Sequence, residues 1–132
     1  MKKTIYFLVI LLALTLSACQ SDGPSTNLNV EMTDFAFTPN HFAVPAGKEI
    51  TVNIAHHGSV VHEFIIMKLG TSAGESFDED DEPNVYELIK VPPGHSQSFT
   101  FTAPAEPGKY QVVCGIVGHL QSGMTATLTV VE

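Results

Sequence analysis

The sequence predicts an all-β fold, a sandwich of about seven or eight short strands, from two observations. The first is alternation of apolar and polar residues in short runs rich in β-branched and aromatic side chains, at 51–55, 98–102, 109–114 and 125–130. A period of two is typical of half-buried strands. The second is the set of proline- and glycine-containing turns between the runs, at 45–47, 92–94 and 107–108. Short strands separated by such turns favour a sandwich of antiparallel character.

The first 18 residues predict an export signal. Two lysines precede a continuous apolar run over residues 5–14, and Leu16-Ser17-Ala18-Cys19 follows. This is the order of a basic segment, an apolar core and a small-residue cleavage site. The run is too short to span a bilayer, which takes about 20 apolar residues. Its ending resembles the bacterial lipobox, so we expect cleavage before Cys19 and a lipid on that residue, with cleavage of a plain secreted protein as the alternative.

Two further segments follow the signal. Residues 19–27 would be the lipid-bearing cysteine and a polar tether, because the stretch from Ser21 to Asn27 has little to bury. Residues 28–132 then form one domain, which is long enough for one sandwich core. The predicted location is the outer face of the cytoplasmic membrane, which is the periplasmic side in a Gram-negative cell.

Charge narrows the choice of partners. The chain carries 14 Asp and Glu against 6 Lys and Arg, a formal net charge of −8. Nucleic acid is excluded, because phosphate recognition requires a basic surface. A protein with a basic docking face is a better partner. The acidic segment 70–83 has few apolar residues and is expected to form a solvated loop between strands, with a helical turn. An acidic docking patch or a weak Ca²⁺ site are its alternative roles.

A run of soft ligands near the C-terminus predicts a copper site. Cys114, His119 and Met124 place a thiolate, an imidazole and a thioether at five-residue intervals. Sulfur and imidazole donors together suit copper, with a short bond to the cysteine and a long, weak one to the methionine. A second imidazole is needed, and His62 is the leading candidate. We expect no disulfide, because Cys19 carries the lipid and Cys114 serves the metal.

The strand pattern predicts that these four side chains meet. The strand over 109–114 would deliver the thiol of Cys114 at its end, and glycines in the following loop would return His119 and Met124 to the same place. His62 precedes the apolar strand 63–67, which could lie beside the strand of Cys114. The other histidines are expected to bind no metal, because their surroundings indicate exposed turns: His41, His56, His57 and His95.

On these residues, from about 28 to 132, the sequence resembles the cupredoxins, the blue copper proteins, with a loop spacing similar to that of auracyanin. The matching features are Cys-x4-His-x4-Met, the strand that follows it, and His62-Glu63-Phe64 upstream. The resemblance implies a Greek-key β-sandwich with His62, Cys114 and His119 as strong equatorial ligands and Met124 as the weak axial one. Glu63 is a departure, since many members have Asn there, which ties the ligand loop by hydrogen bonds.

The implied function is the transfer of single electrons by Cu(I)/Cu(II) cycling in a monomer that is not an enzyme. The partner would be a transient redox protein, such as a cytochrome c or a membrane redox complex, that contacts the surface around His119. A copper enzyme is disfavoured, because no His-Cys-His run for a second centre is present. A copper-trafficking or storage lipoprotein is the main alternative, although the chain has no Met-rich tract. A purely structural sandwich is the third.

Overall fold

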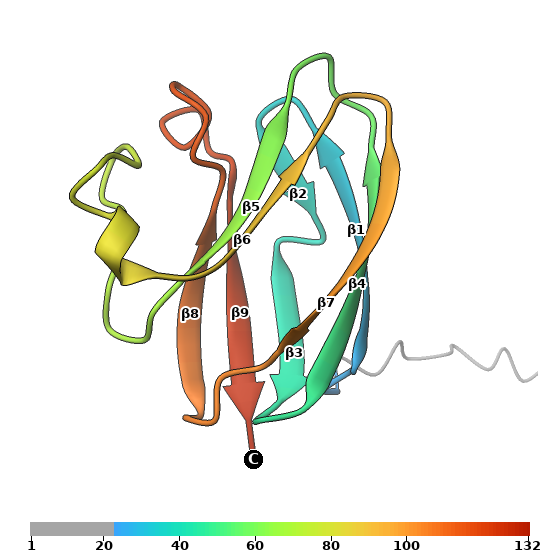
Figure 1. The fold of residues 1–132 in the computed structure, drawn as a ribbon, viewed down its shortest axis with the longest axis vertical. Helices are drawn as coiled ribbons and strands as arrows, with labels where there is room; N and C mark the ends of the chain where they lie inside the picture. The colour runs from blue at the N-terminus through green and yellow to red at the C-terminus, as the bar shows by residue number, and fades with distance from the viewer. Residues whose placement is uncertain (1–22) are drawn as a thin grey trace, which may run out of the picture.

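Nine strands and one short 3-10 helix make up residues 23–132, the part of the chain that the computed structural model describes (Figure 1). No helix within these residues is long and apolar enough to cross a membrane. The predicted signal peptide and Cys19 lie outside the described residues. In chain order the elements are β1 (Asn27–Thr33), β2 (Ala36–Thr38), β3 (His41–Pro45), β4 (Glu49–His56), β5 (His62–Met67), η1 (Glu82–Asn84), β6 (Val85–Val91), β7 (Ser96–Thr102), β8 (Gly108–Val113) and β9 (Thr125–Val131).

The strands form two packed sheets. One has the order β2-β1-β4-β7 and the other the order β3-β9-β8-β5-β6. The predicted all-β sandwich is confirmed, but two strand pairs, β1–β4 and β3–β9, are parallel. The antiparallel expectation was therefore incomplete: after the β1–β2 hairpin the chain crosses to the other sheet, so β1 and β3 pair with strands distant in sequence. The number of strands exceeds the predicted seven or eight, because β2 has only three residues, too few to show an alternating pattern.

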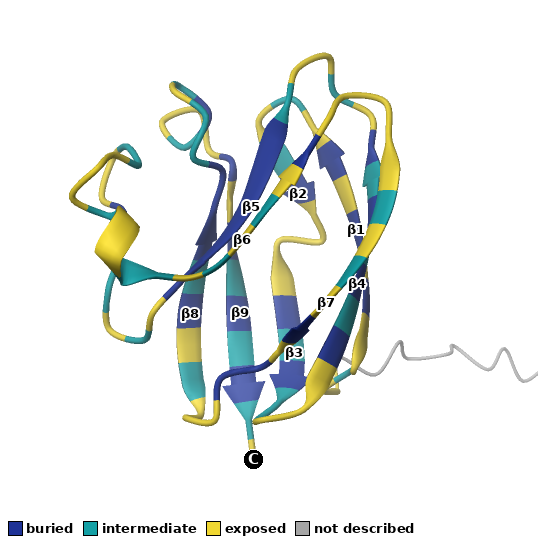
Figure 2. Cartoon of the chain, in the orientation of Figure 1, coloured by how far each residue is buried: buried dark blue, intermediate teal, exposed yellow. Residues whose placement is uncertain are grey.

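The core lies between the sheets and follows the alternation seen in the sequence (Figure 2). In β9 and β4 every second residue is buried. Phe64 of β5 is at an aromatic centre, with ring centroids of Phe37, Phe42 and Phe99 at 5.6, 6.0 and 6.0 Å. Such ring pairs add stabilisation beyond their buried area.

All six residues of β5 are buried, on both faces of the sheet. Ile65 and Met67 point away from the main core into a second apolar cluster, against which Phe77 and Leu120 also pack. Phe77 belongs to the predicted excursion over 70–83, which leaves the sheet between β5 and β6 and contains the single turn η1 at its end. This segment therefore covers the outer face of β5 while it keeps its acidic side chains in solvent.

The sandwich has two distinct ends. At one end, the upper one in Figure 1, lie the β1–β2 turn, the β4–β5 loop and the β8–β9 loop, and the C-terminus is at the other end. Asn27 at the start of β1 pairs with Thr51 near the start of β4, whereas Met32 pairs with His56 at the end of β4. The chain therefore enters the domain at the end opposite to these three connections.

We expect Leu128→Ala in β9 to lower the free energy of unfolding by about 2–5 kcal/mol, because it leaves a cavity in the core. Leu128 is 0% exposed, whereas Leu88 of β6 is 43% exposed. The matched control Leu88→Ala should stay within about 0.5 kcal/mol of the original chain. Urea unfolding measures both, and equal losses in the two variants would contradict the assignment of the core.

Candidate metal centre

The pairing of β5 with β8 brings two of the predicted ligands, His62 and Cys114, to the same place. The strands are antiparallel, with Ile65 opposite Val113. His62, the first residue of β5, and Cys114, the residue after β8, consequently lie at the same end of the sandwich. The β8–β9 loop, residues 114–124, then supplies His119 and Met124.

Three donor atoms converge there from His62, Cys114 and His119 and lie within 4.8 Å of one another. The two Nδ1 atoms are 3.1 Å apart, and the Sγ of Cys114 lies 3.4 Å from Nδ1 of His119 and 3.8 Å from Nδ1 of His62. An ion bonded at about 2.0 Å to nitrogen and 2.3 Å to sulfur in one plane would separate its donors by about 3.5–3.7 Å. The three residues thus fit a trigonal metal site without rearrangement of the backbone.

The ligand loop is closed by its own backbone. The amide of Met124 donates to the carbonyl of His119 at 3.0 Å, and the amide of Cys114 donates to the carbonyl of Met124 at 3.2 Å. Gly118 and Gly123 have φ of 86° and 100°, a left-handed conformation that favours glycine. Met124 is 0% exposed, so its thioether is inside the molecule, on the loop that also carries Cys114 and His119.

Cys114 is a free, fully buried thiol. Burial raises the pKa of this thiol, and the backbone N–H groups of Glu63 and Ile116 oppose the rise. The amide of Glu63 donates to Sγ at 3.4 Å. Because a thiolate, not a thiol, binds metal, this donor is already placed to stabilise the sulfur charge, and a bound cation would supply the rest.

His62 is prepared as a neutral ligand. Burial lowers the pKa of its imidazole, the neighbouring His56 and His119 lower it further, and Asp34 acts in the opposite direction. A neutral imidazole has a free lone pair, which is the form that binds a metal. The environment of His62 therefore favours the protonation state that coordination requires.

The structure places the other histidines differently from one another. The prediction that His56 lies in an exposed turn was wrong: it ends β4, is 3% exposed, and stacks on the ring of His62 with centroids 4.6 Å apart. Its Nδ1 accepts a hydrogen bond from the amide of Gly58 at 3.0 Å, so the turn folds back over the ring and buries it. His57 is exposed, as are His41 and His95.

Glu63 takes part in the site through its backbone, as described above, and its side chain has another partner. The carboxylate forms an ion pair with Lys90 of β6 at 2.8 Å, and this contact raises the pKa of Lys90. It also lies over the ligand loop, since a Cβ on Gly115 would be 2.6 Å from Oε2 of Glu63. Glu63 thus contacts the loop by packing and links β5 to β6 across the sheet.

The β1–β2 turn, Asp34 and Phe35, also reaches the site, which the sequence analysis missed. Oδ1 of Asp34 lies 3.2 Å from Nε2 of His62, and the ring of Phe35 meets His119 edge-on at 5.2 Å. The two residues are far from the ligands in sequence and match no ligand spacing, so no sequence signal connected them to the metal centre.

Over residues 23–132, fold and site together define a β-sandwich with a buried centre of two imidazoles and a thiolate. A family model described as a cupredoxin-like domain matches residues 5–130. The chain therefore belongs to the cupredoxin-like family. A comparison of the sequence with curated proteins finds no match.

Solved structures of auracyanins share this fold. The dithionite-reduced auracyanin of the photosynthetic bacterium Roseiflexus castenholzii is 28% identical, with a TM-score of 0.71 over 83% of this chain and 100% of that one. Auracyanin B is 25% identical, with a TM-score of 0.68 over 83% and 91% of the two chains. Auracyanin A, a "blue" copper protein of Chloroflexus aurantiacus, is 21% identical, with a TM-score of 0.58 over 80% and 99%, and this likeness concerns the fold alone.

We expect His62→Gln to weaken the binding of Cu(II) more than 100-fold, which exceeds the roughly 10- to 100-fold cost of losing a residue that only supports a ligand. His57→Gln is the matched control, because His57 is exposed and close in sequence. Isothermal titration should give one ion per chain for the control and the original protein. Unchanged affinity in His62→Gln would show that this imidazole is not a ligand.

Proposed function

We propose that this chain is a type 1 blue copper protein that carries single electrons. The observation that carries the proposal is the convergence of two Nδ1 atoms and one Sγ within 4.8 Å, with the buried Met124 on the same loop. Two imidazoles and a thiolate with a weak axial thioether are the donor set of blue copper sites. The cupredoxin-like family and the likeness to auracyanins support the same conclusion.

Bound copper would supply one-electron chemistry between Cu(I) and Cu(II). The chain's own residues contribute a fixed geometry: His62 and Cys114 are held by paired strands, and His119 and Met124 by the closed loop. All four side chains are 6% exposed or less, so water is kept from the donors. Because these donors are held in place, little rearrangement of the ligands would accompany a change of oxidation state, and the reorganisation energy of electron transfer would be small.

His119 is the most accessible of the four donor residues, although only 6% of it is exposed. Two exposed apolar residues lie at this end: Phe35, 48% exposed, contacts the ring of His119, and Val117, 93% exposed, is on the same loop as His119. We propose this surface as the contact for a transient redox partner, because small, apolar encounter surfaces suit brief complexes. A cytochrome c or a membrane redox complex has the required chemistry.

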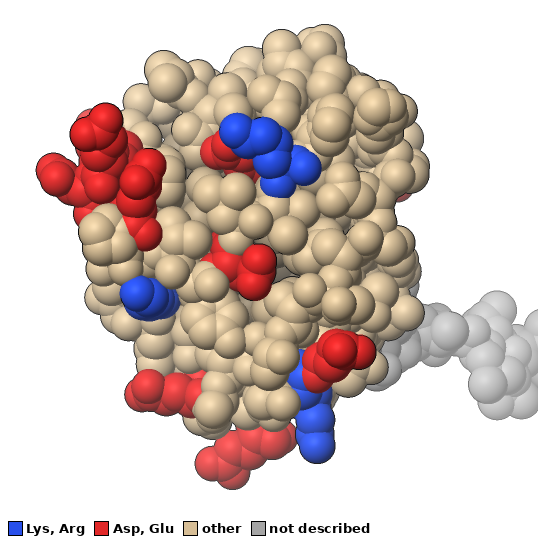
Figure 3. Space-filling view, in the orientation of Figure 1, with Lys and Arg blue, Asp and Glu red and all other residues tan. Residues whose placement is uncertain are grey.

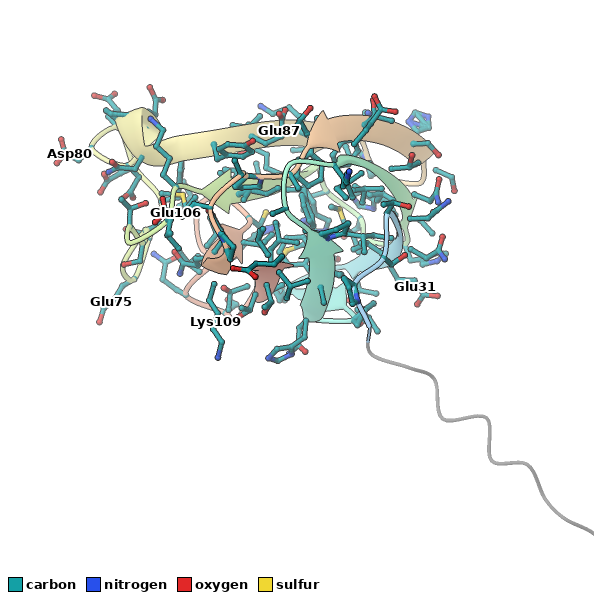
Figure 4. All side chains as sticks on the ribbon, turned by 90° about the horizontal axis from the view of Figure 1, so that it is seen from below. Glu31, Glu75, Asp80, Glu87, Glu106 and Lys109 are labelled. Atoms are coloured by element: carbon teal, nitrogen blue, oxygen red, sulfur yellow. The ribbon has the colours of Figure 1, made fainter. Side chains whose placement is uncertain are left out.

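Acidic side chains flank this end of the molecule. They gather over the segment between β5 and β6 (Figure 3), and Figure 4 shows Glu75 and Asp80 pointing away from the sandwich. Phe77 of this segment packs next to Gly115 of the ligand loop, since a Cβ on Gly115 would lie 3.1 Å from its ring. A partner with a basic face would therefore be attracted toward the metal end, at a rate that falls as salt is added.

We propose that a lipid on Cys19 holds the protein at the outer face of the cytoplasmic membrane. The domain begins at Asn27, at the end of β1 that is remote from the metal centre. Asn27 is eight positions after Cys19, so the chain between them can span at most about 28 Å. If the end of the domain that carries Asn27 faces the membrane, the metal centre lies at the end away from the lipid surface. Redox proteins could then approach it from the aqueous side.

A role in electron transfer rather than catalysis or copper transfer is supported by burial. In the described part of the chain one group of His, Cys and acidic side chains is arranged to hold an ion, and its donors are enclosed. A catalytic metal keeps an open coordination position for the substrate, and a trafficking site must hand its ion to a partner. Enclosed donors serve neither task.

The intense blue absorption of a thiolate–copper bond tests the proposal. We expect residues 20–132 to turn blue on addition of Cu(II), Cys114→Ser to remain colourless, and Met124→Leu to stay blue with a higher reduction potential, because the axial ligand tunes the potential. Copper binding without colour would favour trafficking, and no copper binding would favour a structural sandwich.

A second prediction concerns the anchor. In cells that express the full chain, the protein should sediment with membranes, and Cys19→Ser should move it to the soluble exported fraction while the blue colour persists. Metabolic labelling with a fatty acid provides the direct readout. Recovery of the unaltered, unlabelled protein in the soluble fraction would contradict lipidation.

A further inference from the structure

The two-residue turn between β1 and β2 contacts both imidazoles of the metal centre. Asp34 and Phe35 connect strands in which Thr33 pairs with Ala36. The carboxylate of Asp34 faces the ring of His62, and the ring of Phe35 faces His119. Neither residue supplies one of the converging donor atoms, so their contacts require another explanation.

Asp34 lies on the side of His62 that faces away from the other donors. Its Oδ1 is 3.2 Å from Nε2, whereas Nδ1 of the same ring points to Cys114 and His119. Nε2 is buried and has no well-directed hydrogen bond to any group, Asp34 included, but the carboxylate at 3.2 Å is the charged group that faces it. A proton held on Nε2 by Asp34 leaves the lone pair of Nδ1 free for a metal.

The β4–β5 loop fixes Asp34 in this position. Ser59 donates two hydrogen bonds to the carboxylate, from its amide to Oδ1 at 3.0 Å and from its hydroxyl to Oδ2 at 2.6 Å. These two bonds fix the orientation of the carboxylate beside the ring of His62. Gly58 allows the carboxylate and the imidazole to approach each other, because it has no side chain. A Cβ there would lie 2.4 Å from Oδ1 of Asp34 and 2.6 Å from Nε2 of His62.

Phe35 adopts an unfavourable backbone conformation to make its contact. Its φ is 72°, and among residues 23–132 no other non-glycine residue has a positive φ. A bulky side chain in this region is a genuine outlier that persists where surroundings enforce it, often next to a functional site. The ring is 48% exposed and stands edge-on over His119, with an interplanar angle of 76°.

We propose that the Asp34–Phe35 turn is a positioning element of the metal centre: Asp34 holds the Nε2–H form of His62 and places a negative charge behind it, and Phe35 covers the outer edge of His119. The effect on copper rests on the proposed function. The effect of Asp34 on the tautomer of His62 does not depend on a bound metal. A carboxylate behind a metal-bound imidazole orients the ring and makes it a stronger donor.

The proton on His62 can be observed in protein prepared without metal. We expect ¹⁵N NMR of the imidazoles to find the Nε2–H form of His62 in the original chain and in Asp34→Asn, whose amide oxygen can still accept. Asp34→Ala should lose this single form. Ser59→Ala is the matched control for the loop, because it removes one bond to the carboxylate and leaves the charge beside His62. The same tautomer in Asp34→Ala as in the original chain would overturn the role of Asp34.

The effect of the negative charge of Asp34 is tested in the copper-loaded protein. A carboxylate near the site favours the more highly charged oxidised ion, so Asp34→Asn and Asp34→Ala should both raise the reduction potential, measured by voltammetry. Asp34→Ala should also weaken the binding of Cu(II) about 10- to 100-fold, and Ser59→Ala by less. Equal potentials in all four proteins would refute the electrostatic part of the proposal.

Phe35→Gly tests the cover, with glycine chosen because it adopts a φ of 72° without strain. EDTA should remove copper faster from this variant than from the original protein. Leu88→Ala is the matched control, since Leu88 of β6 is an apolar residue of similar exposure, 43% against 48% for Phe35, and lies outside the ligand loop, so it should not change the rate. An unchanged rate in Phe35→Gly would overturn the role of Phe35.

Failure of the blue copper assignment can be distinguished from failure of the proposed role of the Asp34–Phe35 turn. A chain that never turns blue with Cu(II) refutes the blue copper assignment, whatever residue occupies position 34. The NMR comparison of the original chain with Asp34→Ala then still decides whether the turn holds His62.

Discussion

The register between β5 and β8 is the constraint on which the metal centre depends. With Ile65 opposite Val113, the first residue of β5 and the residue after β8 come to the same end of the sandwich, and the amide of Glu63 donates to the sulfur of Cys114. A shift by one residue would turn every side chain of β5 to the opposite face. Burial of this strand on both faces makes such a shift costly.

The site combines groups whose burial is unfavourable without a metal. The interior raises the pKa of Cys114 and lowers that of His62, so the scaffold opposes charge on both. A buried polar group needs a partner, and a bound cation provides one for the thiolate and for two imidazole lone pairs. Metal binding would therefore stabilise the folded domain, because the unfolded chain offers no comparable arrangement of donors.

Local patterns in the sequence were sufficient to predict the fold class and the grouping of His62, Cys114 and His119. Strand alternation is a property of neighbouring residues, and the loop that returns His119 to Cys114 is short. The features that were missed depend on contacts between distant segments. His56 could not be recognised as buried without the loop that folds over it. Asp34 and Phe35 reach the site only because β1 lies alongside β4, a parallel pairing that no hairpin signal reveals.

The central claim is that one sulfur and two ring nitrogens bind a single copper ion. X-ray absorption at the copper edge of the loaded protein tests it most directly, because the method identifies the neighbours of the metal and their distances. The account predicts one short copper–sulfur distance and two copper–imidazole distances. A shell of nitrogen and oxygen alone, with no sulfur, would contradict it.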